Sequence, residues 1–99
     1  MPSFIIPLEP LAAQSFNAQL GDNLVRFRIQ WMTRFDKFRM DMYASNGQAI
    51  SEGRILHPGI DLFAGIYPPG VSYGRLMMVG DLPTPDNLGI DNQLVWSNG

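Results

Sequence analysis

The sequence predicts an all-β protein, a small antiparallel barrel or sandwich of about six strands. Apolar and polar residues alternate through most of the first half, which is the pattern of half-buried strands. Asn46-Gly47 is a strong hairpin signal, because both residue types tolerate a positive φ. In the second half, proline and glycine recur too often for a long helix.

The first half predicts a meander of four antiparallel strands. Phe16, Ala18 and Leu20 alternate with polar residues, and the turn Gly21-Asp22 follows them. Short turns of this kind join neighbouring antiparallel strands, so each strand should pair with the next along the chain. The four predicted strands cover residues 14–20, 24–32, 37–44 and 48–56.

The apolar faces of the two central strands predict their register. A four-residue loop over residues 33–36 places every apolar side chain opposite another, in the pairs Trp31–Phe38, Ile29–Met40, Phe27–Met42 and Val25–Ala44. The polar face then pairs Gln30 with Arg39, Arg28 with Asp41 and Arg26 with Tyr43. A slip of one residue would put the apolar sets on opposite faces. A shift of the register by two residues keeps the apolar residues on the same face, so the sequence leaves this alternative open.

The second half predicts two further strands, over residues 71–79 and in NQLVW near the end of the chain. Residues 58–70 carry turn signals at both ends and apolar residues between them. We expect one turn of helix or an irregular loop there, packed against the rest of the protein. Residues 81–91 are expected to form a proline-bearing surface loop.

Composition favours a single domain in a reducing compartment. We expect residues 1–99 to form one β domain, with residues 1–12 as a candidate for an extended N-terminal arm. Charged residues make up 16% of the chain, against a usual share of about a quarter, which favours a surface partly covered by a partner. The chain has no cysteine, and neither a signal peptide nor a membrane span is expected.

Residues 25–43 hold five of the seven Lys and Arg residues, and this stretch is a candidate site. Three interpretations are open: a solvated strand face, a protein interface through Arg26, Arg28 and Arg39, or a single-stranded nucleic-acid site that adds Lys37. Two observations weigh against nucleic acid. The net charge is −2, and the aromatic residues of these strands alternate onto the face opposite the arginines.

We predict no catalytic residue, no metal ligand and no cofactor site. His57 is the only histidine and precedes Pro58-Gly59, which fits a turn residue. The aspartates of residues 81–91 are spaced by five, unlike the ligands of a calcium loop. No glycine-rich phosphate cradle is present in the sequence.

Several segments of the chain, among them IIPLEPLAAQSF, VRFRIQW and GRILHPGIDLF, resemble in their order and spacing the baseplate plug proteins of contractile-tailed bacteriophages. The resemblance runs over about residues 4–64 and continues more weakly to the end. It is carried by IIPLEPLAAQSF, VRFRIQW, FRMDMY with ASNGQAI, GRILHPGIDLF, GRLMMVGDL and NLGIDNQLVW. Met32 departs from the pattern, because a polar or turn residue is expected after Trp31.

The resemblance implies a non-enzymatic structural component of a phage tail baseplate. It implies contacts with tube, hub and spike-region proteins, further copies in a three-fold or six-fold ring, and no membrane or cofactor. Contact with nucleic acid would be limited to DNA that passes along the tail. The expected location is the virion tail, after assembly in the host cytoplasm. The candidate interface residues are Arg26, Arg28, Arg39, Ile60, Leu62, Phe63, Tyr67 and Tyr73.

Overall fold

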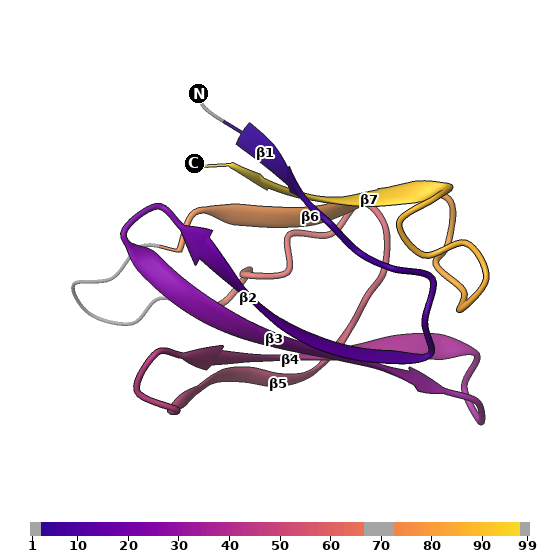
Figure 1. Cartoon of the computed structure of the whole chain (residues 1–99), viewed down its shortest axis with the longest axis horizontal. Coiled ribbons are helices and arrows are strands. Elements are labelled where there is room, and N and C mark those ends of the chain that lie inside the picture. Colours follow the sequence, from indigo (N-terminus) through magenta and orange to yellow (C-terminus); the bar gives the residue numbers. More distant parts are fainter. Residues whose placement is uncertain (1–2, 67–72, 98–99) are drawn as a thin grey trace.

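Two antiparallel sheets packed face to face form the molecule (Figure 1). The computed structural model describes residues 3–66 and 73–97. This part of the chain contains seven strands and no helix, hence none that could cross a membrane. The strands are β1 (Ser3–Ile6), β2 (Ala13–Leu20), β3 (Asn23–Met32), β4 (Lys37–Ala44), β5 (Ala49–Ile55), β6 (Arg75–Gly80) and β7 (Asn92–Ser97).

The predicted meander is confirmed as a four-stranded sheet in the order β2-β3-β4-β5. Its β2–β3 hairpin has Gly21 at a φ of 62°, the left-handed conformation that a tight two-residue turn needs at its first position. In the longer β4–β5 turn, Gly47 has a φ of 87°, and its amide donates to the carbonyl of Ala44 at 2.9 Å. Local turn chemistry therefore determines the order of this sheet.

The predicted register of β3 and β4 is also confirmed. Trp31 pairs with Phe38, Arg28 with Asp41, and Val25 with Ala44, so the loop between the strands covers residues 33–36. The shift of two residues that the sequence left open does not occur. Phe27, Ile29, Met40 and Met42 are fully buried on the inner face, while the arginines alternate onto the outer one.

The second sheet has the order β1-β7-β6 and adds a strand that the sequence analysis did not predict. Residues 3–6 of the candidate arm form β1, which pairs with β7 from the other end of the chain. Strand β6 begins at Arg75, later than predicted. Gly74 precedes it with a φ of 80°, and a Cβ there would lie 2.4 Å from the backbone oxygen of Ser97. The residues 71 and 72 of that prediction lie outside the described residues.

The core lies between the two sheets, which makes the molecule a sandwich and not a closed barrel. Inward residues of both sheets meet there, among them Phe27 and Phe38 from one sheet and Leu76, Met78 and Leu94 from the other. Leu88 from the 81–91 loop is also fully buried. The expected surface loop therefore contributes to the core, although its aspartates remain exposed.

The segment after β5 is an irregular loop packed against β6, one of the two predicted forms. The amide of Gly59 donates to the carbonyl of Met78 at 2.9 Å, and that of Leu62 donates to Leu76 at 2.7 Å. Leu62 and Phe63 are buried in the core. Because these bonds occupy the outer edge of β6, the segment closes that side of the second sheet.

Candidate functional site

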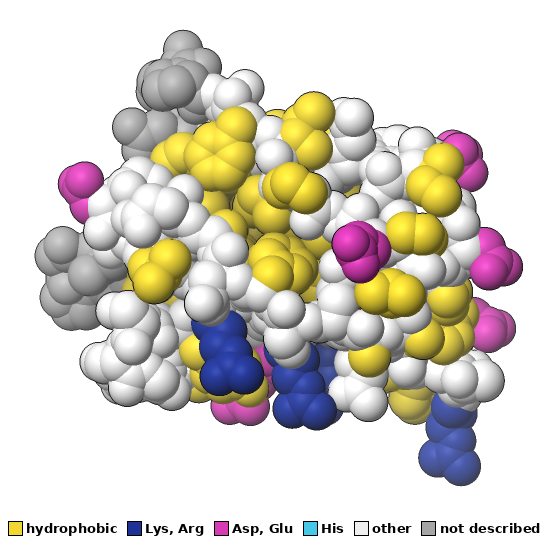
Figure 2. Space-filling model, viewed as in Figure 1, with side chains coloured by type: hydrophobic (Ala, Val, Ile, Leu, Met, Phe, Trp, Pro, Cys, Tyr) yellow, Lys and Arg dark blue, Asp and Glu magenta, His cyan; other side chains and the backbone are white. Residues whose placement is uncertain are grey.

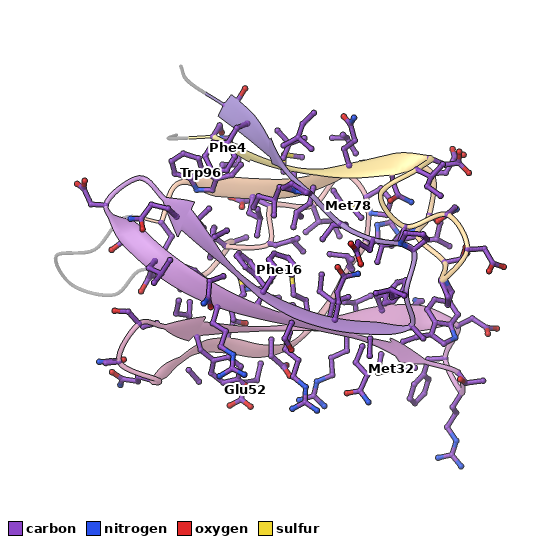
Figure 3. The ribbon with its side chains drawn as sticks, viewed as in Figure 1. Phe4, Phe16, Met32, Glu52, Met78 and Trp96 are labelled. Carbon is purple, nitrogen blue, oxygen red and sulfur yellow. The ribbon has the colours of Figure 1, made fainter. Side chains whose placement is uncertain are left out.

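The candidate site is the outer surface of the four-stranded sheet, here called the arginine face and defined by Arg26, Arg28 and Arg39. Alternation along β3 and β4 sends these side chains away from the core, opposite the buried Phe27 and Met40. The register places Arg28 beside Asp41 and Arg26 beside Tyr43. Figure 3 shows long side chains with terminal nitrogens projecting from this sheet on the side away from the other layer.

Asp41 neutralises Arg39 instead of its cross-strand neighbour Arg28. The Nε atom of Arg39 lies 3.1 Å from Oδ1 of Asp41, and the amide of Gly53 donates to the same oxygen at 2.7 Å. The Asp41 residue is only 6% exposed. The cross-strand pattern predicts Arg28 as the ion-pair partner of Asp41, and this prediction is wrong. Gly53, with a φ of 78°, stands at an irregularity of β5 that turns its amide toward the carboxylate, and no local sequence pattern indicates this contact.

Arg26 and Arg28 are exposed and form no ion pair within the described residues. They line a shallow groove of about 480 Å³ together with Tyr43, Leu24 and the β4–β5 turn. The hydroxyl of Tyr43 lies 3.5 Å from a carboxylate oxygen of Glu52. The groove thus combines two free guanidinium groups with apolar and hydroxyl surface.

Guanidinium groups in such a groove can bind a carboxylate or a phosphate. Phe27 and Phe38 are fully buried on the inner face, so Tyr43, half-buried and next to Glu52, is the one described aromatic residue that lines the groove. Asp41 and Glu52 also add negative charge to the arginine face. These two carboxylates weigh against a nucleic-acid backbone on this face.

The other predicted interface residues differ in how far they are exposed to solvent. Ile60 is 48% exposed, whereas Leu62 and Phe63 belong to the core and cannot reach a partner in this fold. Tyr73 is half-buried and stacks on Phe63 with ring centroids 5.4 Å apart. Tyr67 lies outside the described residues.

The described residues offer no catalytic or metal-binding constellation. His57 is exposed, and its Nδ1 lies 2.9 Å from the carbonyl oxygen of Pro58. Among residues 3–66 and 73–97, no three His, Asp or Glu side chains converge on a point that could hold a metal ion. Asp61 has a structural role, because its carboxylate accepts hydrogen bonds from the amides of Phe63 and Leu76.

One surface was not found by sequence reasoning. Phe4 points inward from β1 but is 41% exposed, because the sandwich is open between β1 and β2. In the sequence, the apolar run SFII is the signal for this strand, within residues that we expected to form an extended arm. The strand could not be identified from residues 1–12 alone, since its partner is β7.

A scan of family models matches residues 3–99 to the family described as cyanophage baseplate Pam3 plug gp18. The match spans both sheets and the loops between them. No curated protein matches the chain significantly.

Proposed function

The chain belongs to the cyanophage Pam3 gp18 family of baseplate plug proteins, and from this premise we propose that it is a non-enzymatic subunit that assembles with itself and with its tail neighbours. The family match over residues 3–99 is the observation that carries the proposal. The family places the protein among the structural components of the virion tail baseplate. During assembly, the protein is in the host cytoplasm.

The proposed partners are tube, hub and spike-region proteins near the tail axis, with further copies of the chain in a three-fold or six-fold ring. The arginine face supplies a suitable contact, because Arg26 and Arg28 project from β3 and pair with no carboxylate among residues 3–66 and 73–97. Exposed Ile60 and half-buried Tyr73 supply apolar contacts elsewhere. Nucleic acid would meet the protein only as DNA passing along the tail.

Charge reversal of Arg28 tests the arginine face. Arg28→Glu should change the free energy of unfolding by less than about 0.5 kcal/mol, because the side chain is exposed and unpaired. If a neighbouring carboxylate binds it, the amount of this chain in purified tails should fall at least about tenfold, the effect of a few kcal/mol at a desolvated ion pair.

Arg34→Glu is the matched control, because Arg34 is an exposed arginine in the loop after β3. It carries the same change of charge and should leave incorporation at the wild-type level. Normal incorporation of Arg28→Glu would remove the arginine face from the interface. Absence of the wild-type chain from tails would contradict the proposed function itself.

The salt dependence of single-strand binding distinguishes a nucleic-acid site from a protein interface. Phosphate contacts through Arg26, Arg28, Lys37 and Arg39 would make single-strand binding weaken steeply with added salt. We expect no such binding at low salt, measured by the fluorescence anisotropy of a labelled oligonucleotide. Tight, salt-sensitive binding that is lost in Arg28→Glu would favour the alternative.

A further inference from the structure

The side of the sandwich formed by β1 and β2 is incompletely closed. A groove of about 400 Å³ runs between the two strands, lined by Phe4–Ile6 from β1, by Pro7 just after it and by Phe16–Gln19 from β2. Figure 2 shows hydrophobic side chains gathered through the middle of this face, and Figure 3 places Phe4 on one sheet and Phe16 between the two layers. We call this feature the edge groove.

The residues that line the edge groove point inward but remain accessible. Phe4 packs on Trp96 with ring centroids 5.1 Å apart, yet 41% of it is exposed. Phe16 stacks on the fully buried Phe27 at 5.3 Å and is only half-buried. In a closed sandwich, inward aromatic residues at these positions would be covered by a neighbouring strand.

The backbone beside the groove is also free. The amide of Trp31 donates to the carbonyl of Ala12, which shows that the even-numbered residues of β2 exchange hydrogen bonds with β3. The amides of Ala13, Ser15, Asn17 and Gln19 therefore point away from β3. Within the described residues, no backbone group accepts a hydrogen bond from them.

The other edges of the two sheets are protected. The outer edge of β6 is bonded to residues 59–62, and β5 carries Glu52, Arg54 and an irregularity at Gly53. Strands β1 and β2 contain no charged residue, no proline and no register shift. Charged residues, prolines and register shifts are the features by which proteins usually keep an exposed edge strand from pairing with another chain.

We propose that the edge groove receives an extended, uncharged strand of another tail protein, which hydrogen-bonds to the outer edge of β2. Only an extended backbone matches amides spaced two residues apart, and its inward side chains must be apolar to cover Phe4 and Phe16. That the donor is a tail protein rests on the proposed function. That the ligand is a strand rests on the bare edge and the groove.

A second copy is a less suitable donor. Two-fold pairing of β2 with the β2 of another copy would place both sets of free arginines, Arg26 and Arg28, on one continuous sheet face. No acidic side chain lies on β2 to balance them. A donated strand of a different chain brings no such charge.

Amide hydrogen exchange of residues 13–20 tests the proposal without a substitution. In wild-type tails, this segment should exchange at least about tenfold more slowly than in the isolated chain, because its outward amides become bonded. An unchanged rate with the chain present in tails overturns the strand proposal and leaves the proposed function standing. Absence of the chain from tails overturns both.

Exchange in the isolated chain identifies the donor. Protection of residues 13–20 that grows with the concentration of the isolated chain would identify a second copy as the occupant and overturn the proposed donor. Rapid exchange at every concentration, followed by protection in tails, supports it.

A proline substitution at Asn17 tests the proposed hydrogen bonds at the outer edge of β2. Asn17→Pro removes an outward amide and no hydrogen bond to β3, so the sheet should still form. Loss of this bond should reduce incorporation into tails about tenfold. Thr33→Pro is the control, because Thr33 occupies the second position of the turn in which Phe35 donates to Met32, where proline is favoured. Wild-type incorporation of folded Asn17→Pro would contradict the proposal.

Discussion

Asp41 shows how a single residue can link two neighbouring strands. Its carboxylate is almost fully buried on the outer face of the sheet, where one oxygen accepts hydrogen bonds from Arg39 and from the Gly53 amide. Burial of a carboxylate is unfavourable unless such donors replace water. The residue therefore fixes the irregular part of β5 and leaves Arg28 unpaired for a partner.

Two substitutions of Asp41 should distinguish the stability that comes from its hydrogen bond to Gly53 from the stability that comes from its charge. Asp41→Ala leaves the Gly53 amide without its acceptor and should lower the free energy of unfolding by about 1–3 kcal/mol. Asp41→Asn can keep that hydrogen bond while losing the charge, so a smaller decrease is expected. Urea denaturation measures both values. Equal values for the two variants would show that the charge, and not the amide bond, carries the effect.

The loop after β5 covers the outer edge of β6, although it contains no regular strand. Its backbone bonds to β6, and Asp61 accepts from the amides of Phe63 and Leu76 at 3.0 and 3.2 Å. The guanidinium of Arg54 also donates to the carbonyl of Ala64. These contacts hold Leu62 and Phe63 in the core.

Removal of the Asp61 carboxylate should loosen this loop before it unfolds the sandwich. In Asp61→Ala, the amides of Phe63 and Leu76 lose their acceptor and should exchange at least about tenfold faster. Amides in the centre of β3 should be unaffected, and they serve as the internal reference in an NMR exchange series. Uniform acceleration along the chain would instead show that the loop and the sheets open together.

The whole molecule depends on one core shared by two sheets. Trp31 lies in the four-stranded sheet, where it packs edge-on against Phe38, and Trp96 lies in the other sheet, where its indole Nε1 donates to the carbonyl of Tyr73 at 2.6 Å. A Cβ added to Gly21 in the β2–β3 turn would lie 3.6 Å from the Trp96 ring, so the turn of one sheet lies close to the indole of the other. We therefore expect the two sheets to unfold together.

Single-tryptophan variants can test this cooperativity. Trp31→Phe leaves a fluorescent reporter only in the three-stranded sheet, and Trp96→Phe leaves one only in the four-stranded sheet. Within each variant, fluorescence and far-UV circular dichroism should give the same denaturation midpoint. Midpoints that differ between the two probes would contradict a single domain.

Sequence patterns predicted the arginine face but not its internal pairing. Alternation of apolar residues separated Arg26 and Arg28 from the core, because one face of each strand must be buried. Which cation meets Asp41 depended on side-chain reach and on the bend of β5. The sequence also did not predict that Leu62 and Phe63 are buried in the core, because an apolar loop can pack either on the protein's own core or on a partner.

By itself, the sequence determined the meander, the parity of the β3–β4 register and the side of the sheet on which the arginines lie. Those features depend on turns and alternation among neighbouring residues, where pairing requires only short loops. Tertiary structure alone decided that Ser3–Ile6 pairs with Asn92–Ser97, that the loop after β5 covers β6, and that the side between β1 and β2 stays open. These pairings join segments distant in sequence, so no local pattern specifies them.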